Sequence, residues 1–263
     1  MELSIDGDAA LVTASSSGLG KASAKALAAD GANVVMNGRD EDRLEEAVAE
    51  VREVAEGEVV GQPGDLTEPD DIEELVERTV SEFGGLDHLV TSAGGPPSGP
   101  FLETDDEDWY EAFDLLVMSV VRLVREAEPH LTDGDGGTIV TITSRSVKEA
   151  IDDLVLSNSV RMGVIGLEKT LSKELAPEVR ANAVLPGVHE TPRIEELVEQ
   201  AVERGEHDSY EEGIEERGSG IPVGHVGDPM DLGRTVAFLS APESSYVNGQ
   251  AVTIDGGAGA SNL

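Results

Sequence analysis

Ser157 and Arg161 form the most informative polar pair in the chain. Another serine, Ser144, lies thirteen residues before Ser157. A spacing of four residues places Ser157 and Arg161 on one face of a helix, within reach of each other. The guanidinium of Arg161 stays charged at any working pH, so it can bind hydroxyl groups and stabilise an oxyanion, but it cannot accept a proton. A serine hydroxyl is poorly matched to general acid catalysis, which works best with a pKa near the operating pH. We therefore expect any proton to come from water or from a substrate group.

A run of small residues, 13–20, joins a short apolar strand pattern to a helical pattern. Small residues let backbone N–H groups approach a pyrophosphate, and the N-terminus of the following helix adds a favourable dipole. Many tight turns share this signal, so its neighbours in the chain decide what it means.

These residues need a scaffold, and the chain supplies short apolar runs that alternate with longer helical patterns. We expect strands at 9–13, 33–36, 58–61, 86–91, 138–143, 180–185 and 251–254. We expect helices at 19–29, 41–55, 69–83, 107–131, 154–175 and 229–239. This alternation predicts a doubly wound parallel α/β sheet of the Rossmann-like class, and we interpret residues 1–263 as a single domain.

Residues 191–220 interrupt the alternation with two acidic helical patterns, 193–204 and 208–217. Ligands of open α/β sheets lie beyond the carboxyl ends of the strands, so an insertion after a late strand is well placed to be a substrate lid. A solvated surface excursion is the alternative.

The charge balance is extreme, with 18 Lys+Arg against 54 Asp+Glu and a net charge of −36. The acids are spread along the chain, and this pattern is similar to that of proteins from salt-loving cytoplasm; an ordinary acidic bacterial protein is the less favoured alternative. The same charge argues against nucleic-acid and anionic-membrane partners, which need a basic surface. Cysteine is absent and no apolar run reaches membrane-spanning length, so we expect a cytoplasmic protein. The five histidines lack metal-ligand spacing, so we expect no metal site.

Five motifs in order give the chain a resemblance to the short-chain dehydrogenase/reductase family over essentially its full length. They are the loop at 13–20, the Asp-Leu pair at 65–66, Thr-Ser-Ala-Gly at 91–94, the Asn-to-Thr segment at 182–191 and the closing segment at 247–257. The pattern looks most like 3-oxoacyl-carrier-protein reductases and sugar or steroid alcohol dehydrogenases. The resemblance implies an oxidoreductase that interconverts a carbonyl and an alcohol, on a small-molecule or acyl-carrier substrate, and a homo-oligomer, usually a tetramer.

The resemblance also implies a set of residues that bind a nicotinamide dinucleotide. These are Ala14, Ser16, Ser17, Gly18, Leu19, Gly20, Arg39, Asp65, Leu66, Ser92, Ala93, Gly94, Arg161, Pro186, Gly187 and Thr191. Gly38 stands where an acidic residue would select NAD, and Arg39 after it suits a 2′-phosphate, so we favour NADP over NAD. The alternative is that Arg39 pairs with Asp40 or Asp42 on the surface, which leaves NAD possible.

The catalytic positions depart from the family pattern at three places. The resemblance assigns Ser144 to the carbonyl oxygen, but Ser157 replaces the family's tyrosine acid and Arg161 replaces its lysine. Leu116 falls near the position of an asparagine that supports a proton-relaying water. We expect Ser144, Ser157 and Arg161 to form an atypical catalytic site; the alternative is a non-catalytic nucleotide sensor or the silent partner of a mixed oligomer.

Two cations near Ser144, Arg145 and Lys148, offer a grip for an anionic substrate. Pairing with Glu149, Asp152 or Asp153 is an equally favoured alternative.

Overall fold

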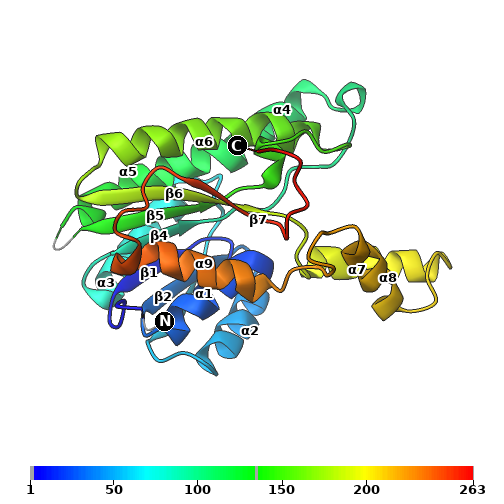
Figure 1. Ribbon diagram of the computed structural model, residues 1–263. Coiled ribbons are helices and arrows are strands. Elements are labelled where there is room, and N and C mark those ends of the chain that lie inside the picture. The colour runs from blue at the N-terminus through cyan, green and yellow to red at the C-terminus, as the bar shows by residue number, and fades with distance from the viewer. Residues whose placement is uncertain (1–2, 134–135, 263) are drawn as a thin grey trace.

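The computed structural model describes residues 3–133 and 136–262, and its centre is a seven-stranded sheet (Figure 1). The strands are β1 Ala9–Val12, β2 Asn33–Gly38, β3 Val59–Pro63, β4 His88–Thr91, β5 Gly137–Ile142, β6 Val179–Pro186 and β7 Ala251–Ile254. All paired strands are parallel, and their order is β3-β2-β1-β4-β5-β6-β7. The predicted doubly wound α/β class is therefore confirmed.

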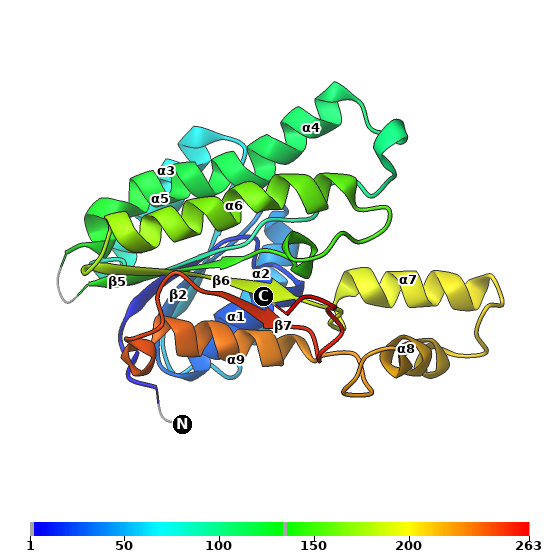
Figure 2. The ribbon, with the colours of Figure 1, turned by 45° about the horizontal axis from the view of Figure 1, so that its top comes forward.

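Helices cover both faces of the sheet (Figure 2). One face packs against α1 Gly18–Ala29, α2 Glu41–Arg52 and α9 Pro229–Ser240, and the other against α3 Pro69–Phe83, α5 Ser119–Leu131 and α6 Val155–Glu174. Each layer has its own apolar core, one around Leu27 and Met36, the other around Leu75 and Ile139. Because both faces are covered, the central strands β1, β4 and β5 are buried along their whole length rather than alternating between buried and exposed residues.

The direction in which the sheet grows reverses between β1 and β4. From β1 the chain builds outward through β2 to β3, whereas β4 pairs with the other side of β1 and leads to β7. In such sheets a crevice opens at the carboxyl ends of the two strands where the direction reverses. The loops after β1 and β4 therefore border the expected ligand site.

The single helix expected at 107–131 is divided into two. α4 spans Asp106–Phe113, one turn of π-helix spans Asp114–Met118, and α5 follows. The side chain of Asp114 is held by Arg122, whose Nη2 donates to Asp114 Oδ1 at 2.7 Å. Turns of this type are rare and are often found at functional sites.

Two further helices, α7 Pro192–Glu203 and α8 Tyr210–Ser219, form a hairpin that projects from the sheet (Figures 1 and 2). The two helices pack closely: a Cβ added to Gly213 would lie 2.6 Å from Val198 Cγ1. The predicted helical patterns at 193–204 and 208–217 match this hairpin.

Short 3₁₀ turns complete the fold, at Phe101–Glu103, Arg145–Val147 and Pro242–Ser244. Within the described part of the chain, none of the helices has the length and apolar character needed to cross a membrane.

Candidate functional site

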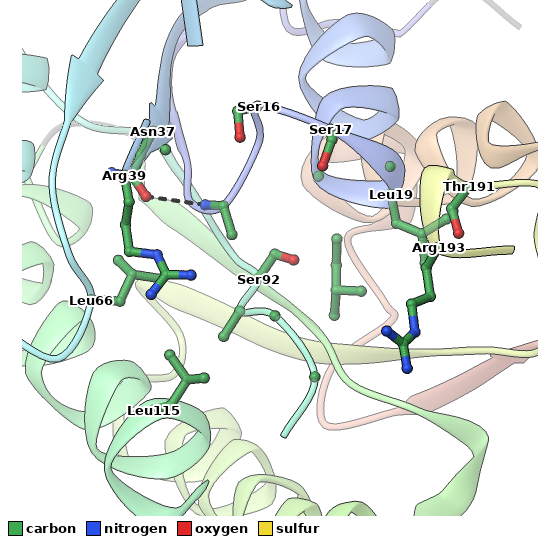
Figure 3. A pocket seen from close by; sticks show the side chains of 18 of the residues that line it. Ser16, Ser17, Leu19, Asn37, Arg39, Leu66, Ser92, Leu115, Thr191 and Arg193 are labelled. Atoms are coloured by element: carbon green, nitrogen blue, oxygen red, sulfur yellow. Dashed lines mark hydrogen bonds between the residues drawn. The ribbon is translucent and has the colours of Figure 1, made fainter. Parts of the chain in front are cut away.

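A cavity of about 500 Å³ opens at the carboxyl ends of β1, β2, β4 and β5 (Figure 3). It is lined by Ala14, Ser16, Ser17, Gly18, Leu19, Gly20, Asn37, Gly38, Arg39, Arg43, Gly64, Asp65, Leu66, Ser92, Ala93, Gly94, Gly95, Leu115, Ile142, Thr143, Arg161, Thr191, Pro192 and Arg193. Most of the predicted cofactor residues therefore share one cavity. The exceptions are Pro186 and Gly187, which do not line it.

The loop between β1 and α1 is held tightly against its surroundings. Ala14 has a φ of 45° and donates its N–H to Asn37 Oδ1 at 3.1 Å, as the dashed line in Figure 3 shows. A Cβ on Gly20 would lie 2.3 Å from the Ala14 carbonyl oxygen, so only glycine allows this turn. The first turn of α1 carries no acidic residue, which leaves the positive end of the helix dipole facing the cavity uncompensated.

Ser16 and Gly38 approach each other closely at the end of β2. A Cβ on Gly38 would lie 2.8 Å from both Cβ and Oγ of Ser16, so a side chain at position 38 cannot coexist with Ser16 as placed. Arg39 follows Gly38 directly, and Arg43 in the first turn of α2 lines the same cavity. This corner holds a hydroxyl and two guanidinium groups, which are donors suited to a phosphate.

Arg39 pairs with Asp65, not with the two surface acids that follow it in the chain. Arg39 Nη1 lies 3.8 Å from Asp65 Oδ2, whereas Asp40 caps α2 by accepting the Arg43 N–H. Partial burial raises the pKa of Asp65, but hydrogen bonds from Thr67 and the charge of Arg39 outweigh it, so the pKa is lowered. Asp65 is therefore ionised at neutral pH.

The end of β4 is fixed against β1 by a reciprocal pair of hydrogen bonds. Thr13 Oγ1 donates to the Ser92 carbonyl at 2.8 Å, and the Ser92 N–H donates to Thr13 Oγ1 at 2.9 Å. Ser92, Ala93 and Gly94 are thereby held along the floor of the cavity.

Ser144 and Ser157 belong to one hydrogen-bonded group of serines. The Ser146 N–H donates to Ser144 Oγ at 3.1 Å, and Ser146 Oγ lies 3.0 Å from Ser157 Oγ. Ser157 is buried, and neither Ser144 nor Ser157 lines the 500 Å³ cavity. Their predicted part in catalysis stays a prediction, and Ser146, which joins them, was not identified from sequence.

Arg161 lies in α6 with its guanidinium at the cavity wall. Its side chain is 8% exposed, Nη2 donates to the Gly94 carbonyl at 3.2 Å, and Nε has no hydrogen-bond partner. Burial lowers the pKa of Arg161 to about 10, which still leaves it charged at neutral pH. The predicted cation is thus present in the site, without a compensating carboxylate among the described residues.

Leu116 is buried in an apolar cluster with Leu156, Val160 and Val164, and it does not line the cavity. Its neighbour Leu115 does. Leu116, which falls near the position of the family's asparagine, and its neighbour Leu115 therefore offer no polar side chain to hold a water.

Arg145 is neutralised locally. Its Nη1 lies 2.6 Å from Glu149 Oε1, which is the pairing alternative raised from the sequence. Lys148 lines a second cavity of about 280 Å³ near the C-terminus, together with Asp255.

Gly187 is required by packing and does not contact the cavity. A Cβ there would lie 2.6 Å from Asp255 Cβ, so β6 and the turn after β7 meet only through glycine. Pro186 ends β6 beside it. Both remain predicted cofactor contacts. Thr191, by contrast, lines the cavity next to Gly18, where an added Cβ would lie 3.6 Å from Thr191 Cγ2.

Several lining residues were not identified from the sequence, above all Arg43, Leu115 and Arg193. Arg193 stands at the start of α7 and its side chain points into the cavity beside Thr191 (Figure 3). Arg43 and Arg193 occupy first turns of acidic helices, where a sequence indicates only solvent exposure. Among the described residues, no group of three or more His, Cys, Asp or Glu is arranged to hold a metal ion.

A buried carboxyl group lies behind the site, on the sheet-facing side of α6. Glu168 is 3% exposed, one of its oxygens accepts a hydrogen bond from Thr141 Oγ1, and Oε2 has no partner. Thr91 Oγ1 donates in turn to Thr141 Oγ1 at 2.8 Å. Burial raises the pKa of Glu168 to about 8, although the bond from Thr141 acts to lower it.

Comparisons with known proteins agree with this geometry. Residues 13–259 match the family model described as enoyl-(acyl carrier protein) reductase. The chain is 33% identical to a 3-oxoacyl-(acyl-carrier-protein) reductase FabG of Thermotoga maritima, covering 96% of this chain and 98% of that protein. It is 30% identical to dehydrogenase/reductase SDR family member 4 of Caenorhabditis elegans, covering 96% and 95%.

Solved structures give the same answer. The L-sorbose reductase of Gluconobacter frateurii, complexed with NADPH and L-sorbose, superposes with a TM-score of 0.93 at 29% identity over 98% of both chains. An actinorhodin polyketide ketoreductase with NADPH superposes with a TM-score of 0.87 at 31% identity over 96% of this chain and 97% of that one. The sequence motifs, the sheet order and these matches together show that the chain belongs to the short-chain dehydrogenase/reductase family.

Proposed function

We propose that this chain is an NADP(H)-dependent oxidoreductase that interconverts a carbonyl and an alcohol, as 3-oxoacyl reductases and alcohol dehydrogenases do. The charge of the cavity carries the proposal. Arg39, Arg43, Arg161 and Arg193 line it against the single carboxylate of Asp65, among the described residues of a chain with net charge −36. A cavity of this charge in such an acidic protein favours a polyanionic ligand.

The cavity residues fit the parts of the dinucleotide. The N-terminus of α1, at Ser17 to Gly20, suits the pyrophosphate, because its N–H groups and dipole favour an anion. Ser16, Arg39 and Arg43 suit a 2′-phosphate. Asp65 and Leu66 border the space left for the adenine, and Arg161 is placed to hold ribose hydroxyls or an oxyanion.

The residues suit reduction without a tyrosine. When bound, NADPH supplies the hydride for the carbonyl carbon. We assign Ser144 to hydrogen-bonding the carbonyl oxygen and Arg161 to stabilising the negative charge that develops there. No phenol, imidazole or thiol lines the described cavity, and the Ser157 hydroxyl is engaged with Ser146, so we assign the proton to water or to a substrate group.

A non-catalytic nucleotide-binding protein is the second candidate. Two observations favour it: the apolar Leu116 stands near the position of the family's asparagine, and the Ser157 hydroxyl is engaged with Ser146. Both candidates bind the cofactor, so they separate only on turnover.

The cofactor is tested by titrating intrinsic fluorescence with NADPH and NADH. We expect tighter NADPH binding, and about a tenfold loss of NADPH affinity in Arg39→Ala with little change for NADH. Arg234→Ala is the matched control, because Arg234 is exposed on α9 and pairs with Asp231. Tighter binding of NADH by the unchanged protein would contradict the assignment.

Turnover is tested by following NADPH oxidation against a panel of carbonyl compounds in molar KCl. We expect Ser144→Ala to lower kcat by roughly a hundredfold, since it removes a hydrogen bond to the reacting oxygen. Ser81→Ala on α3 serves as the control because Ser81 is exposed and outside the cavity. No substrate-dependent oxidation, or a Ser144→Ala rate equal to that of the control, would favour the non-catalytic candidate.

We also propose that residues 191–220 act as the substrate lid and that the protein works in a salt-rich cytoplasm. We further propose that it forms a homo-oligomer, as its family implies. Exposed Leu102 and Tyr110 near α4, at 92% and 75% exposure, support a covered surface there. Arg193 in the cavity wall supports the lid, because it belongs to the projecting hairpin.

A further inference from the structure

Arg161 carries a charge that nothing in the described chain compensates. It is nine-tenths buried, its single acceptor is the neutral carbonyl of Gly94, and its Nε has no partner. The only carboxylate of the described cavity, Asp65, is paired with Arg39. A buried cation without an anion is costly, so its persistence in the site indicates a ligand with negative charge.

The cofactor's phosphates already have other partners. The pyrophosphate is expected at the N-terminus of α1, and a 2′-phosphate at Ser16, Arg39 and Arg43. In Figure 3, Ser16 and Ser17 lie on one side of the cavity and Leu115 on the opposite side. Arg161 belongs to the Leu115 side, because the turn at Asp114–Met118 packs against α6 and the Arg161 guanidinium reaches Gly94.

Ribose hydroxyls can accept hydrogen bonds from Arg161, as proposed above, but they do not neutralise its charge. They leave the desolvated guanidinium without a counter-charge. A carboxylate matches a guanidinium in both charge and planar geometry, since two parallel N–H···O bonds can form.

The neighbouring groups are also of the kind that bind an anion. Ser157 precedes Arg161 by one helical turn in α6, and its hydroxyl lies 3.0 Å from Ser146 Oγ. Arg145, the nearest other arginine in this part of the chain, is already neutralised by Glu149 at 2.6 Å. Arg161 is thus a buried cation without an ion pair on the Leu115 side of the described cavity.

We propose that Arg161 binds a carboxylate of the substrate, so that this protein acts on oxo acids or hydroxy acids rather than on neutral ketones or alcohols. The inference rests on the proposed function for turnover, but not for binding. On this proposal, the arginine that replaces the family's lysine binds the substrate, and the substrate carboxylate supplies the negative charge that the site lacks.

The test compares matched pairs of ligands that differ only in charge. Acetoacetate with methyl acetoacetate, and 2-oxobutanoate with methyl 2-oxobutanoate, are titrated calorimetrically into the protein in molar KCl, with and without saturating NADP⁺. We expect each carboxylate to bind about tenfold more tightly than its ester, or more. Equal binding of acid and ester would overturn the proposal.

Variants locate the preference. Arg161→Met, of similar length and no charge, should abolish the preference for the acid, and Arg161→Lys should restore part of it. Arg145→Met is the matched control, expected to keep the preference, and a loss of preference there would place the carboxylate elsewhere and overturn the assignment. Thermal melts of all variants confirm folding.

The NADPH titration separates this inference from the proposed function. If Arg161→Met weakens NADPH strongly and leaves the acid-to-ester ratio unchanged, Arg161 serves the cofactor and the inference fails alone. If the unchanged protein does not bind NADPH but still prefers the carboxylates, the proposed function fails and the carboxylate site stands.

Discussion

Glu168 shows how one side chain can link burial to proton uptake. Its carboxyl group is enclosed between α6 and the sheet, and only one of its oxygens has a partner. Removal from water disfavours the charged form, so burial raises the pKa to about 8 from an ordinary value of 4.5. The group is therefore mostly neutral at pH 7 in the folded protein and ionised in the unfolded chain.

Glu168→Gln is expected to change how stability depends on pH. Because the folded pKa is raised, the contribution of Glu168 is fully present below about pH 4.5 and is lost as pH rises toward about 8. The amide removes this loss, so the variant should gain on the order of a few kcal/mol relative to the unchanged protein between these limits.

Urea unfolding at constant molar KCl, measured across this pH range, checks the expectation. Glu174→Gln is the control, since Glu174 is exposed on the same helix. Parallel pH curves for the unchanged protein and Glu168→Gln would contradict it.

At the scale of elements, regular patterns were predictable and tertiary adjustments were not. The strands and most helices follow from apolar runs and helical periodicity, which bury the same residues in any packing of this class. The π-turn at Asp114–Met118 could not be predicted from the sequence, because Leu115, Leu116 and Val117 continue the apolar pattern of the helix. The turn packs against α6, a tertiary contact that the local sequence does not reveal.

The site was predictable where a motif carried it. Most loop residues from Ala14 to Gly20, the pair Asp65 and Leu66, and the segment from Ser92 to Gly94 were found through motifs, and they line the cavity. Arg43 and Arg193 were not, because only the fold brings the first turns of α2 and α7 to the same cavity.

The α7–α8 hairpin is expected to lose mobility when the cofactor binds. It buries few side chains, among them Val198 and Ala201, so local opening should be easy in the free protein. Contact between Arg193 and a phosphate would tie α7 to the cavity, so amides in α7 should exchange about tenfold more slowly with saturating NADPH.

Hydrogen–deuterium exchange measures this directly. Arg193→Ala should remove most of the protection, and α3, which does not border the cavity, is the internal reference. Unchanged exchange of α7 at saturating NADPH would count against the lid.

At the scale of the whole molecule, charge opposes folding. A net charge of −36 on 263 residues repels itself, and the repulsion extends further as salt is removed because the Debye length grows. Few ion pairs reduce this repulsion. Lys21 with Glu50 and Arg78 with Glu82 form salt bridges, but most acids in the described chain do not.

The melting temperature should therefore rise with salt, by at least about 5 °C between dilute buffer and molar KCl. Differential scanning calorimetry measures it, with an uncharged solute at equal osmolarity as the control. Equal midpoints in the two salt conditions would contradict the expectation.

The close approach of Gly38 to Ser16 has a consequence for how this protein can evolve. An acidic residue at position 38 is the usual route to NAD, but its Cβ would lie 2.8 Å from the Ser16 side chain. The route therefore needs a glycine at position 16 before or together with the change at 38, because Ser16 Cβ itself makes the close contact. Either step alone loses the hydroxyl that we propose to bind the 2′-phosphate or strains the loop. Cofactor preference is therefore protected by epistasis between position 16, after β1, and position 38, at the end of β2.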